Sequence, residues 1–230
     1  MEQAQMLRMT KEFEHMVEEF FTVQCRYQAA MRQIRAKLEN LDDEFQMQHS
    51  RNPIHSIETR MKSIASMVEK LQRNHMEVSV SSAVDNLFDI AGVRVICSYI
   101  ADIYRIADLL TSQDDVYVLR VRDYIRKPKP NGYRSLHLVV EVPVYLSEGC
   151  TRVPVEIQIR TIAMDFWATL EHNLRYKSPD TIPEGISEEL LQAAKDIEEL
   201  DERMQSIRDR LDSHREEEAG RTDAAGKGEK

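Results

Sequence analysis

Three short stretches of this 230-residue chain hold the residues best suited to chemistry. In the first, Asp89 and Arg94 flank Gly92, which combines a hard oxygen ligand, a phosphate-binding guanidinium and a point of close approach for backbone or ligand. In the second, Glu156 lies within an alternating apolar segment. If Asp89 and Glu156 meet, they can hold one Mg²⁺, because a carboxylate pair is the usual protein share of a magnesium site that water and nucleotide phosphates complete.

The third stretch, residues 120–134, is strongly basic. It carries six Lys and Arg against one Asp, a net charge of +5, whereas the whole chain carries −9 and the remaining residues therefore −14. Pro128 and Pro130 stiffen the stretch, and Asn131-Gly132 suits a tight turn, so the cations are presented on a shaped loop. Such a loop favours a polyphosphate, with Tyr133 as a stacking platform for a base. An ordinary solvated basic loop is the open alternative.

Alternation with a period of two predicts a sheet in the middle of the chain. Strands are expected over 93–98, 116–122, 135–145 and 152–160, with a helix over 102–110. The third strand places His137 on the face opposite its leucines, and the fourth places Glu156, Gln158 and Arg160 on one face. The sheet should therefore have a core on one side and a site on the other, although an antiparallel sheet with one merely wetted face gives the same pattern.

Helical patterns precede this sheet. Apolar residues recur in steps of three and four over 9–45, which predicts one long helix or a broken pair of helices. The segment 49–53 breaks this period, and a second amphipathic helix is expected over 57–71. Arg60 should then lie on that helix, beside its apolar stripe.

Two further helices are expected after the sheet. Thr161 can cap a helix that runs to Tyr176, and Ser187 can cap the last helix. The predicted class is α+β, with a central mixed sheet of about five strands flanked by helices and with long helices at both ends. The expected divisions are an N-terminal helical flank over 1–50, a catalytic core over 51–178, a C-terminal helical flank over 179–216 and a disordered tail over 217–230.

Several classes of protein lack their signatures here. The chain has no GxxxxGK[ST] loop, no GxGxxG after a strand, no HExxH and no His-Asp dipeptide, which argues against P-loop hydrolysis, Rossmann redox chemistry and an HD-type phosphohydrolase. Its three cysteines show no CxxC spacing and are expected to be reduced thiols. With no signal peptide and no long apolar run, we expect a cytoplasmic protein that binds no membrane.

Taken together, the motifs resemble those of a known family. Asp89-Ile-Ala-Gly-Val-Arg94, Lys127-Pro-Lys-Pro-Asn-Gly-Tyr-Arg-Ser-Leu-His137 and Val155-Glu-Ile-Gln-Ile-Arg-Thr161 are similar to motifs of the RelA/SpoT-type synthetase domain, most closely in the RelQ-type small alarmone synthetases. The resemblance covers roughly Pro53 to Lys177. It implies a nucleotidyltransferase-like fold and a GTP pyrophosphokinase, which transfers the β,γ-pyrophosphate of ATP to the 3′-hydroxyl of GTP or GDP and forms pppGpp or ppGpp and AMP.

The resemblance also implies roles for individual residues. Asp89 and Glu156 would be catalytic and bind Mg²⁺, with Glu156 also accepting the 3′-hydroxyl proton. ATP would be bound by Arg60, Lys62, Arg94 and Arg134, with Arg60 and Arg94 enclosing the adenine. The guanine nucleotide would be bound by Tyr133, Arg122, Lys127, Lys129, Asn131 and His137, with Tyr133 as the platform for the base.

The same resemblance implies a setting for the protein. It would be a bacterial enzyme of the stringent response, without hydrolase activity, that assembles as a homotetramer through its flanking helices. Apart from the resemblance, the basic groove is compatible with single-stranded RNA as a partner. Two alternatives stay open at this point. One is a catalytically weak nucleotide- or RNA-binding regulator with the same fold, and the other is a scaffold whose two amphipathic ends carry the function while the sheet is inert.

Overall fold

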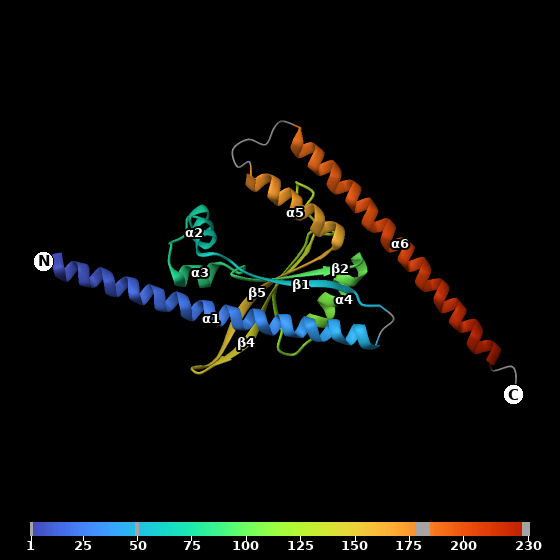
Figure 1. The fold of residues 1–230 in the computed structure, drawn as a ribbon, viewed down its shortest axis with the longest axis horizontal. Coiled ribbons are helices and arrows are strands. Elements are labelled where there is room, and N and C mark those ends of the chain that lie inside the picture. Colours follow the sequence, from blue (N-terminus) through green and yellow to red (C-terminus); the bar gives the residue numbers. More distant parts are fainter. Residues whose placement is uncertain (1, 49–50, 178–184, 227–230) are drawn as a thin grey trace.

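A five-stranded sheet lies at the centre of the molecule (Figure 1). The structure, a computed structural model, describes residues 2–48, 51–177 and 185–226. The strands are β1 (Ile54–Met61), β2 (Ala91–Cys97), β3 (Tyr117–Asp123), β4 (Leu136–Leu146) and β5 (Gly149–Thr161). In the order β1-β2-β5-β4-β3, only the β2–β5 pair is parallel, so the predicted mixed sheet is confirmed.

The helices of the described residues are α1 (Glu2–Gln48), α2 (Ile64–Arg73), α3 (Val80–Asn86), α4 (Ile100–Thr111), α5 (Ile162–Lys177) and α6 (Ile186–Gly226). Of these, α1 and α4 bury one face of the sheet. Ile34 and Leu38 of α1 and Ile106 of α4 are fully buried with Val95 and Ile157 of the sheet. The alternation expected from the sequence is therefore confirmed, and it leaves the opposite face of the sheet free for polar residues.

The predicted long helix at the N-terminus is confirmed as α1, which extends along the sheet in Figure 1. Its stripe from Phe20 to Phe45 packs against the core, as its three- and four-residue steps predict. The side chains of Met9, Phe13 and Met16 lie outside the described part of the chain.

The C-terminal helices are fixed to the end of β5. Thr161 Oγ1 accepts a hydrogen bond from the Met164 N–H at 3.1 Å, which confirms its predicted cap, and donates one to Asp201 Oδ2 of α6 at 2.6 Å. Trp167 of α5 donates from Nε1 to the carbonyl of Leu190 in α6 at 3.0 Å. Through these contacts α6 is held against the C-terminal end of β5.

The helix expected over 57–71 is wrong in its first part. Residues Ile54 to Met61 form strand β1, which pairs with β2, and only the part from Ile64 is helical. Ile57 and Met61 are four residues apart, and this spacing puts two side chains on the same face of a helix and of a strand alike. Arg60 therefore lies on an edge strand and not on a helix.

The last helix also differs from the expectation at both ends. The Glu189 N–H donates to the carbonyl of Gly185, whose φ is +92°, so α6 starts before Ser187. At its other end α6 continues to Gly226, where the sequence predicts a disordered tail. The Glu, Ala and Arg residues of this stretch have high helix propensity, which favours propagation of a helix that already exists.

Removing Arg51 should destabilise the fold. Arg51 forms a two-bond fork to Asp102 at 2.6 Å for both N–O contacts, and Asp102 is only 2% exposed. Arg51→Met leaves that carboxylate buried and unpaired, so we expect the free energy of unfolding to fall by about 3 kcal/mol in denaturant titration at fixed protein concentration. Arg35→Met, which breaks an exposed pair with Glu39, is the control and should cost less than about 1 kcal/mol. Equal effects of the two variants would contradict this account.

Candidate active site

Two rows of side chains cross the polar face of the sheet. Strand register aligns one residue from each strand in a first row, Glu58, Arg94, Gln158, His137 and Arg122. Two residues along each strand, the second row is Arg60, Gly92, Glu156, Val139 and Arg120. Because residues two apart on a strand share a face, both rows project to the same side.

Gly92 leaves a gap in the second row between Arg60 and Glu156. A Cβ at Gly92 would lie 3.5 Å from the Arg60 carbonyl oxygen, an ordinary contact, so the backbone does not require glycine here. The missing side chain opens instead onto a cavity of about 420 Å³. Arg60, Lys62 and Arg94 line this first cavity, and their cations suit a phosphorylated ligand.

A second cavity of about 400 Å³ adjoins the first. Its cationic and imidazole side chains are Lys70, Arg120, Arg122 and His137. Asp89 and Glu156 line both cavities, so this carboxylate pair stands at the boundary between them. Two phosphate-bearing molecules, one in each cavity, would meet at these carboxylates.

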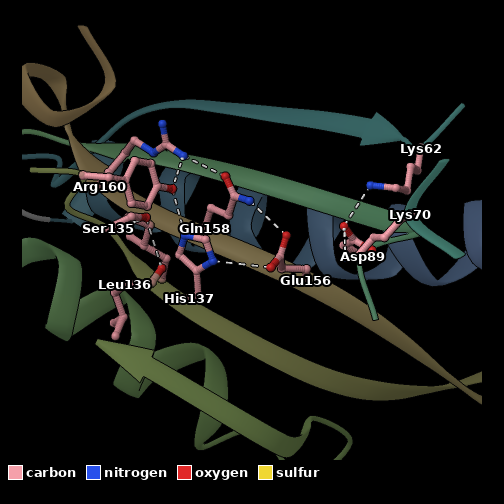
Figure 2. A network of polar contacts seen from close by, with 11 residues as sticks. Lys62, Lys70, Asp89, Ser135, Leu136, His137, Glu156, Gln158 and Arg160 are labelled. Atoms are coloured by element: carbon pink, nitrogen blue, oxygen red, sulfur yellow. Dashed lines mark hydrogen bonds and ion pairs between the residues drawn. The ribbon is translucent and has the colours of Figure 1, made fainter. Parts of the chain in front are cut away.

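Asp89, in the loop that leads into β2, forms hydrogen bonds with two lysines. Lys62 and Lys70 both donate to its Oδ2, at 2.9 and 2.7 Å (Figure 2). Burial alone would raise the pKa of Asp89, but the hydrogen bonds from Lys70 and Lys62 outweigh burial and lower the pKa below its usual value. Its other oxygen, Oδ1, is buried without a hydrogen-bond partner, which leaves one lone-pair site for a cation.

Glu156 is held from both sides in the same way. His137 Nδ1 lies 3.3 Å from its Oε1, and Gln158 Nε2 donates to its Oε2 at 2.9 Å (Figure 2). Burial would raise the pKa of Glu156, but the contact with His137 and the hydrogen bond from Gln158 lower it overall. Glu156 is therefore ionised at neutral pH and has lone pairs free to accept a proton or bind a cation.

The basic stretch forms a loop beside the cavities. Gly132 has a φ of +87°, and its N–H donates to the carbonyl of Lys129 at 2.8 Å, so the predicted tight turn is present. Lys129 Nζ lies over the rings of Tyr124 and Tyr133, at 4.7 and 4.6 Å from their centroids. Tyr133 is bound through its hydroxyl to His137 Nε2 at 2.8 Å, which ties the loop to the sheet.

Eight of the twelve site residues predicted from the sequence line the two cavities or adjoin them. They are Arg60, Lys62, Asp89, Arg94, Arg122 and Glu156, together with His137 and the adjoining Tyr133. Lys127 and Lys129 are exposed on the loop and, in the part of the chain that the structure describes, line neither of the two cavities.

Arg134 and Asn131 point elsewhere. Arg134 is only 7% exposed and lies 3.4 Å from Glu198 of α6, and Asn131 donates to Glu171 of α5 at 3.1 Å. Both partners lie on helices that follow the sheet, 40 residues beyond Asn131 and 64 residues beyond Arg134 along the chain. The loop residues therefore anchor the loop to the C-terminal helices and do not line the cavities.

Several site residues had no assigned role in the sequence. Three of them line the second cavity without being part of a recognised motif: Lys70 of α2, Phe88 and Arg120. Of these, only Arg120 belongs to the basic stretch. Gln158 shares the strand face of Glu156, and this alternation was the signal that could have marked it.

Neither a complete metal cage nor a membrane-spanning helix is found among the residues that the structure describes. No group of three or more His, Cys, Asp or Glu side chains there could hold a metal ion. Likewise, no described helix is both long and apolar enough to cross a bilayer. A cation at Asp89 and Glu156 would need further ligands from a bound nucleotide.

Comparison with known proteins gives consistent matches. The family model described as "Region found in RelA / SpoT proteins" matches residues 59–181. The GTP pyrophosphokinase YwaC of Bacillus subtilis is 44% identical over 186 residues, which cover 81% of this chain and 89% of YwaC.

Solved structures agree with this result. The small alarmone synthetase 1 of Bacillus subtilis bound to its product pppGpp gives a TM-score of 0.76 at 37% identity, over 81% of this chain and 94% of that one. The same synthetase bound to AMPCPP gives 0.74 at 33% identity, over 85% of this chain and 99% of that one. The α+β class and the family resemblance expected from the sequence are therefore confirmed. Because the family model matches more than half of the chain, and YwaC is related over most of both sequences, the chain belongs to the RelA/SpoT family.

Proposed function

We propose that this protein is a GTP pyrophosphokinase that transfers the β,γ-pyrophosphate of ATP to the 3′-hydroxyl of GTP or GDP. The observation that carries the proposal is the position of Asp89 and Glu156 on the boundary of two cation-lined cavities. A transfer between two nucleotides needs two phosphate sites that meet at one reacting centre. The products are pppGpp or ppGpp and AMP, and relatives with this fold carry matching names.

ATP occupies the first cavity in this proposal. Arg60 pairs with Gly92 from β1, and Arg94 lies two residues beyond Gly92 on β2, so both guanidinium groups line the same cavity and can enclose a base. Lys62 lies at the Asp89 end of the same cavity, where the phosphates would lie. The structure of a relative with bound AMPCPP supports a nucleotide in this fold.

The acceptor nucleotide occupies the second cavity. Arg120 and Arg122 of β3 and Lys70 of α2 supply positive charge for its phosphates. Tyr133 is proposed to stack on the guanine, which requires Lys129 to leave the ring that it covers in this structure. Lys127 and Lys129 would then be free to bind acceptor phosphates from the loop side.

We propose that Asp89 and Glu156 hold a Mg²⁺ together with the ATP phosphates. The unpartnered buried Oδ1 of Asp89 and the lowered pKa of both carboxyl groups fit a hard cation with oxygen ligands. Such an ion, when bound, neutralises charge on the phosphate oxygens during transfer.

The chain's own residues then manage the proton and the alignment. The acceptor 3′-oxygen attacks the β-phosphorus of ATP, a new O–P bond forms, and the bond from the β-phosphorus to the α,β-bridging oxygen breaks. AMP leaves with that oxygen. Glu156 accepts the proton of the 3′-hydroxyl, and no covalent intermediate with the protein is required.

The exposed cations of the loop support a second candidate. Arg126, Lys127 and Lys129 are all exposed and line neither of the two cavities. They suit a regulator that binds nucleotides or single-stranded RNA without turnover, with an affinity that falls steeply as salt rises.

The three free cysteines are consistent with a reducing compartment, and we propose that the protein is located in the cytoplasm.

Neutralising either carboxylate should abolish transfer. Glu156→Gln and Asp89→Asn are expected to lower the rate of AMP release from ATP, GTP and Mg²⁺ by about 100-fold or more, because general-base catalysis and charge stabilisation are lost. The assay is chromatography of the nucleotides, run with GTP, GDP and GMP as acceptors. Glu141→Gln on β4, which lines neither cavity, is the control and should keep the wild-type rate. Nucleotide or RNA binding with no AMP from the wild type would favour the regulator instead.

A methyl group at Gly92 should interfere with ATP alone. Gly92→Ala fits the backbone but projects into the first cavity, so we expect the KM for ATP to rise by about tenfold, since overpacking costs ~1–3 kcal/mol. Steady-state kinetics measure this, and the KM for GTP and the unfolding midpoint serve as internal controls. An equal rise in both KM values would show that the first cavity is not selective for ATP.

We also propose that the protein assembles as a homotetramer. Exposed apolar side chains form stripes on α5 and α6, at Ile162, Phe166, Leu170 and Leu174 and at Leu200, Met204, Ile207 and Leu211. Two stripes of four exposed apolar side chains each favour burial against another chain. The names of the relatives do not give an assembly, so the stripes are the supporting observation.

Charge on the α5 stripe should break this assembly. Phe166 is 60% exposed, and Phe166→Glu is expected to reduce the mass measured by light scattering from four chains to two or one. Tyr145→Glu, at the exposed β4–β5 hairpin, is the control and should keep the wild-type mass. A wild type that runs as a monomer would contradict the proposal.

A further inference from the structure

Five polar side chains form a closed ring of contacts next to the proposed reacting centre. Arg160 Nη2 donates to the Tyr133 hydroxyl at 3.0 Å and to Gln158 Oε1 at 2.7 Å. Gln158 Nε2 reaches Glu156 Oε2 at 2.9 Å, His137 Nδ1 lies 3.3 Å from Glu156 Oε1, and His137 Nε2 lies 2.8 Å from the Tyr133 hydroxyl. Figure 2 shows Arg160 and Glu156 at opposite ends of this ring.

The direction of every hydrogen bond in the ring is fixed by its two ends. A guanidinium can only donate, and a carboxylate can only accept. In one arm, Arg160 occupies the amide oxygen of Gln158, so the NH₂ of Gln158 must face Glu156.

The other arm fixes a histidine tautomer. Glu156 can only accept, so its contact with His137 requires a proton on Nδ1. In the neutral imidazole, Nε2 then accepts from the Tyr133 hydroxyl, whose oxygen accepts in turn from Arg160. Both arms therefore start at the donors of Arg160 and end at the two oxygens of Glu156.

Arg160 is built in rigidly enough to act as this anchor. It is 3% exposed on β5, and its Nη1 lies 3.3 Å from Asp165 Oδ1 in the first turn of α5. A buried arginine that carries only one direct carboxylate contact is costly unless its remaining donors are used. Here two of those donors orient neighbours of Glu156 and bind no ligand in the two cavities.

We propose that Arg160 is a positioning residue, which acts through Gln158 in one arm and through Tyr133 and His137 in the other to hold the Glu156 carboxylate in place for the acceptor hydroxyl. The inference rests on the proposed pyrophosphate transfer for its role in catalysis. The ring itself can be tested without substrate. Because Arg160 lines neither cavity, its loss should affect alignment at the transition state more than nucleotide binding.

The experiment combines kinetics with ¹⁵N NMR of histidine side chains in the full-length protein, with the His137 signal assigned from a His137→Gln spectrum. Wild type should show His137 protonated on Nδ1. In Arg160→Met we expect a mixture of the two tautomers, with kcat lowered about 10- to 100-fold and both KM values within about twofold of wild type. Arg160→Lys, which keeps a charged donor, should recover part of kcat.

Two further variants keep the test decisive. Tyr133→Phe keeps the aromatic side chain but removes the hydroxyl that links Arg160 to His137. It should therefore give the tautomer mixture even if Arg160→Met does not fold. Arg152→Met, on the same strand but stacked on Tyr117, should change neither the tautomer nor kcat.

The outcomes separate the two claims. An unchanged tautomer in Tyr133→Phe, or a His137 protonated on Nε2 in wild type, overturns the inference about the ring. A folded Arg160→Met with wild-type kcat overturns the positioning role. A wild type with the Nδ1 tautomer but no pyrophosphate transfer overturns the proposed function and leaves the ring orientation standing.

Discussion

The parallel pairing of β2 with β5 determines the geometry of the site. It sets Gly92 beside Glu156, and it brings Asp89, which precedes β2, to the same end of the sheet. Because α1 and α4 bury the other face, the side chains of this pair have only one side on which to form a site. Moving the register by one residue would turn Glu156 into the core and the valines and isoleucines of β5 into the cavities.

Charge at the site is balanced in a way that the overall charge of the chain hides. A chain with a net charge of −9 presents Lys62, Lys70, Arg94 and Arg120 around two partly buried carboxylates. Lys70 and Lys62 lower the pKa of Asp89 against the effect of burial, and a histidine and an amide lower that of Glu156, so both groups stay ionised. A nucleotide that enters brings its own negative charge and shares cations that are already in position, which avoids reorganisation during transfer.

The acidic helix α6 has a structural role near this centre. Glu198 pairs with Arg134, Asp201 accepts from Thr161, and Ala194 packs against the turn at Gly132, where a Cβ would lie only 2.4 Å from the Ala194 side chain. The basic loop is thus held against α6 on one side, while on the other side Lys127 is exposed and Lys129 covers the rings of Tyr124 and Tyr133. The loop's rigidity comes from these contacts as well as from its prolines.

The sequence was informative wherever a short-range pattern determines the outcome. Alternation in β4 and β5 placed His137 and Glu156 on the polar face, and the Asn131-Gly132 pair marked the turn. It failed where the outcome depends on distant partners. Ile57 and Met61 fit a helix and a strand equally, and pairing with β2 decides between the two. Arg134 turns away from the cavities because Glu198, far along the chain, lies behind it, and the ring around Arg160 depends on the register of two strands.

The most direct test of the account is a ³¹P NMR time course of the purified protein with ATP, GTP and Mg²⁺. The account predicts that ATP is converted to AMP while a new diphosphate appears on the 3′-oxygen of the guanosine nucleotide, one for one. Conversion of ATP to ADP and phosphate, or AMP without a 3′-modified guanosine, would contradict the claim that Asp89 and Glu156 join a donor and an acceptor nucleotide.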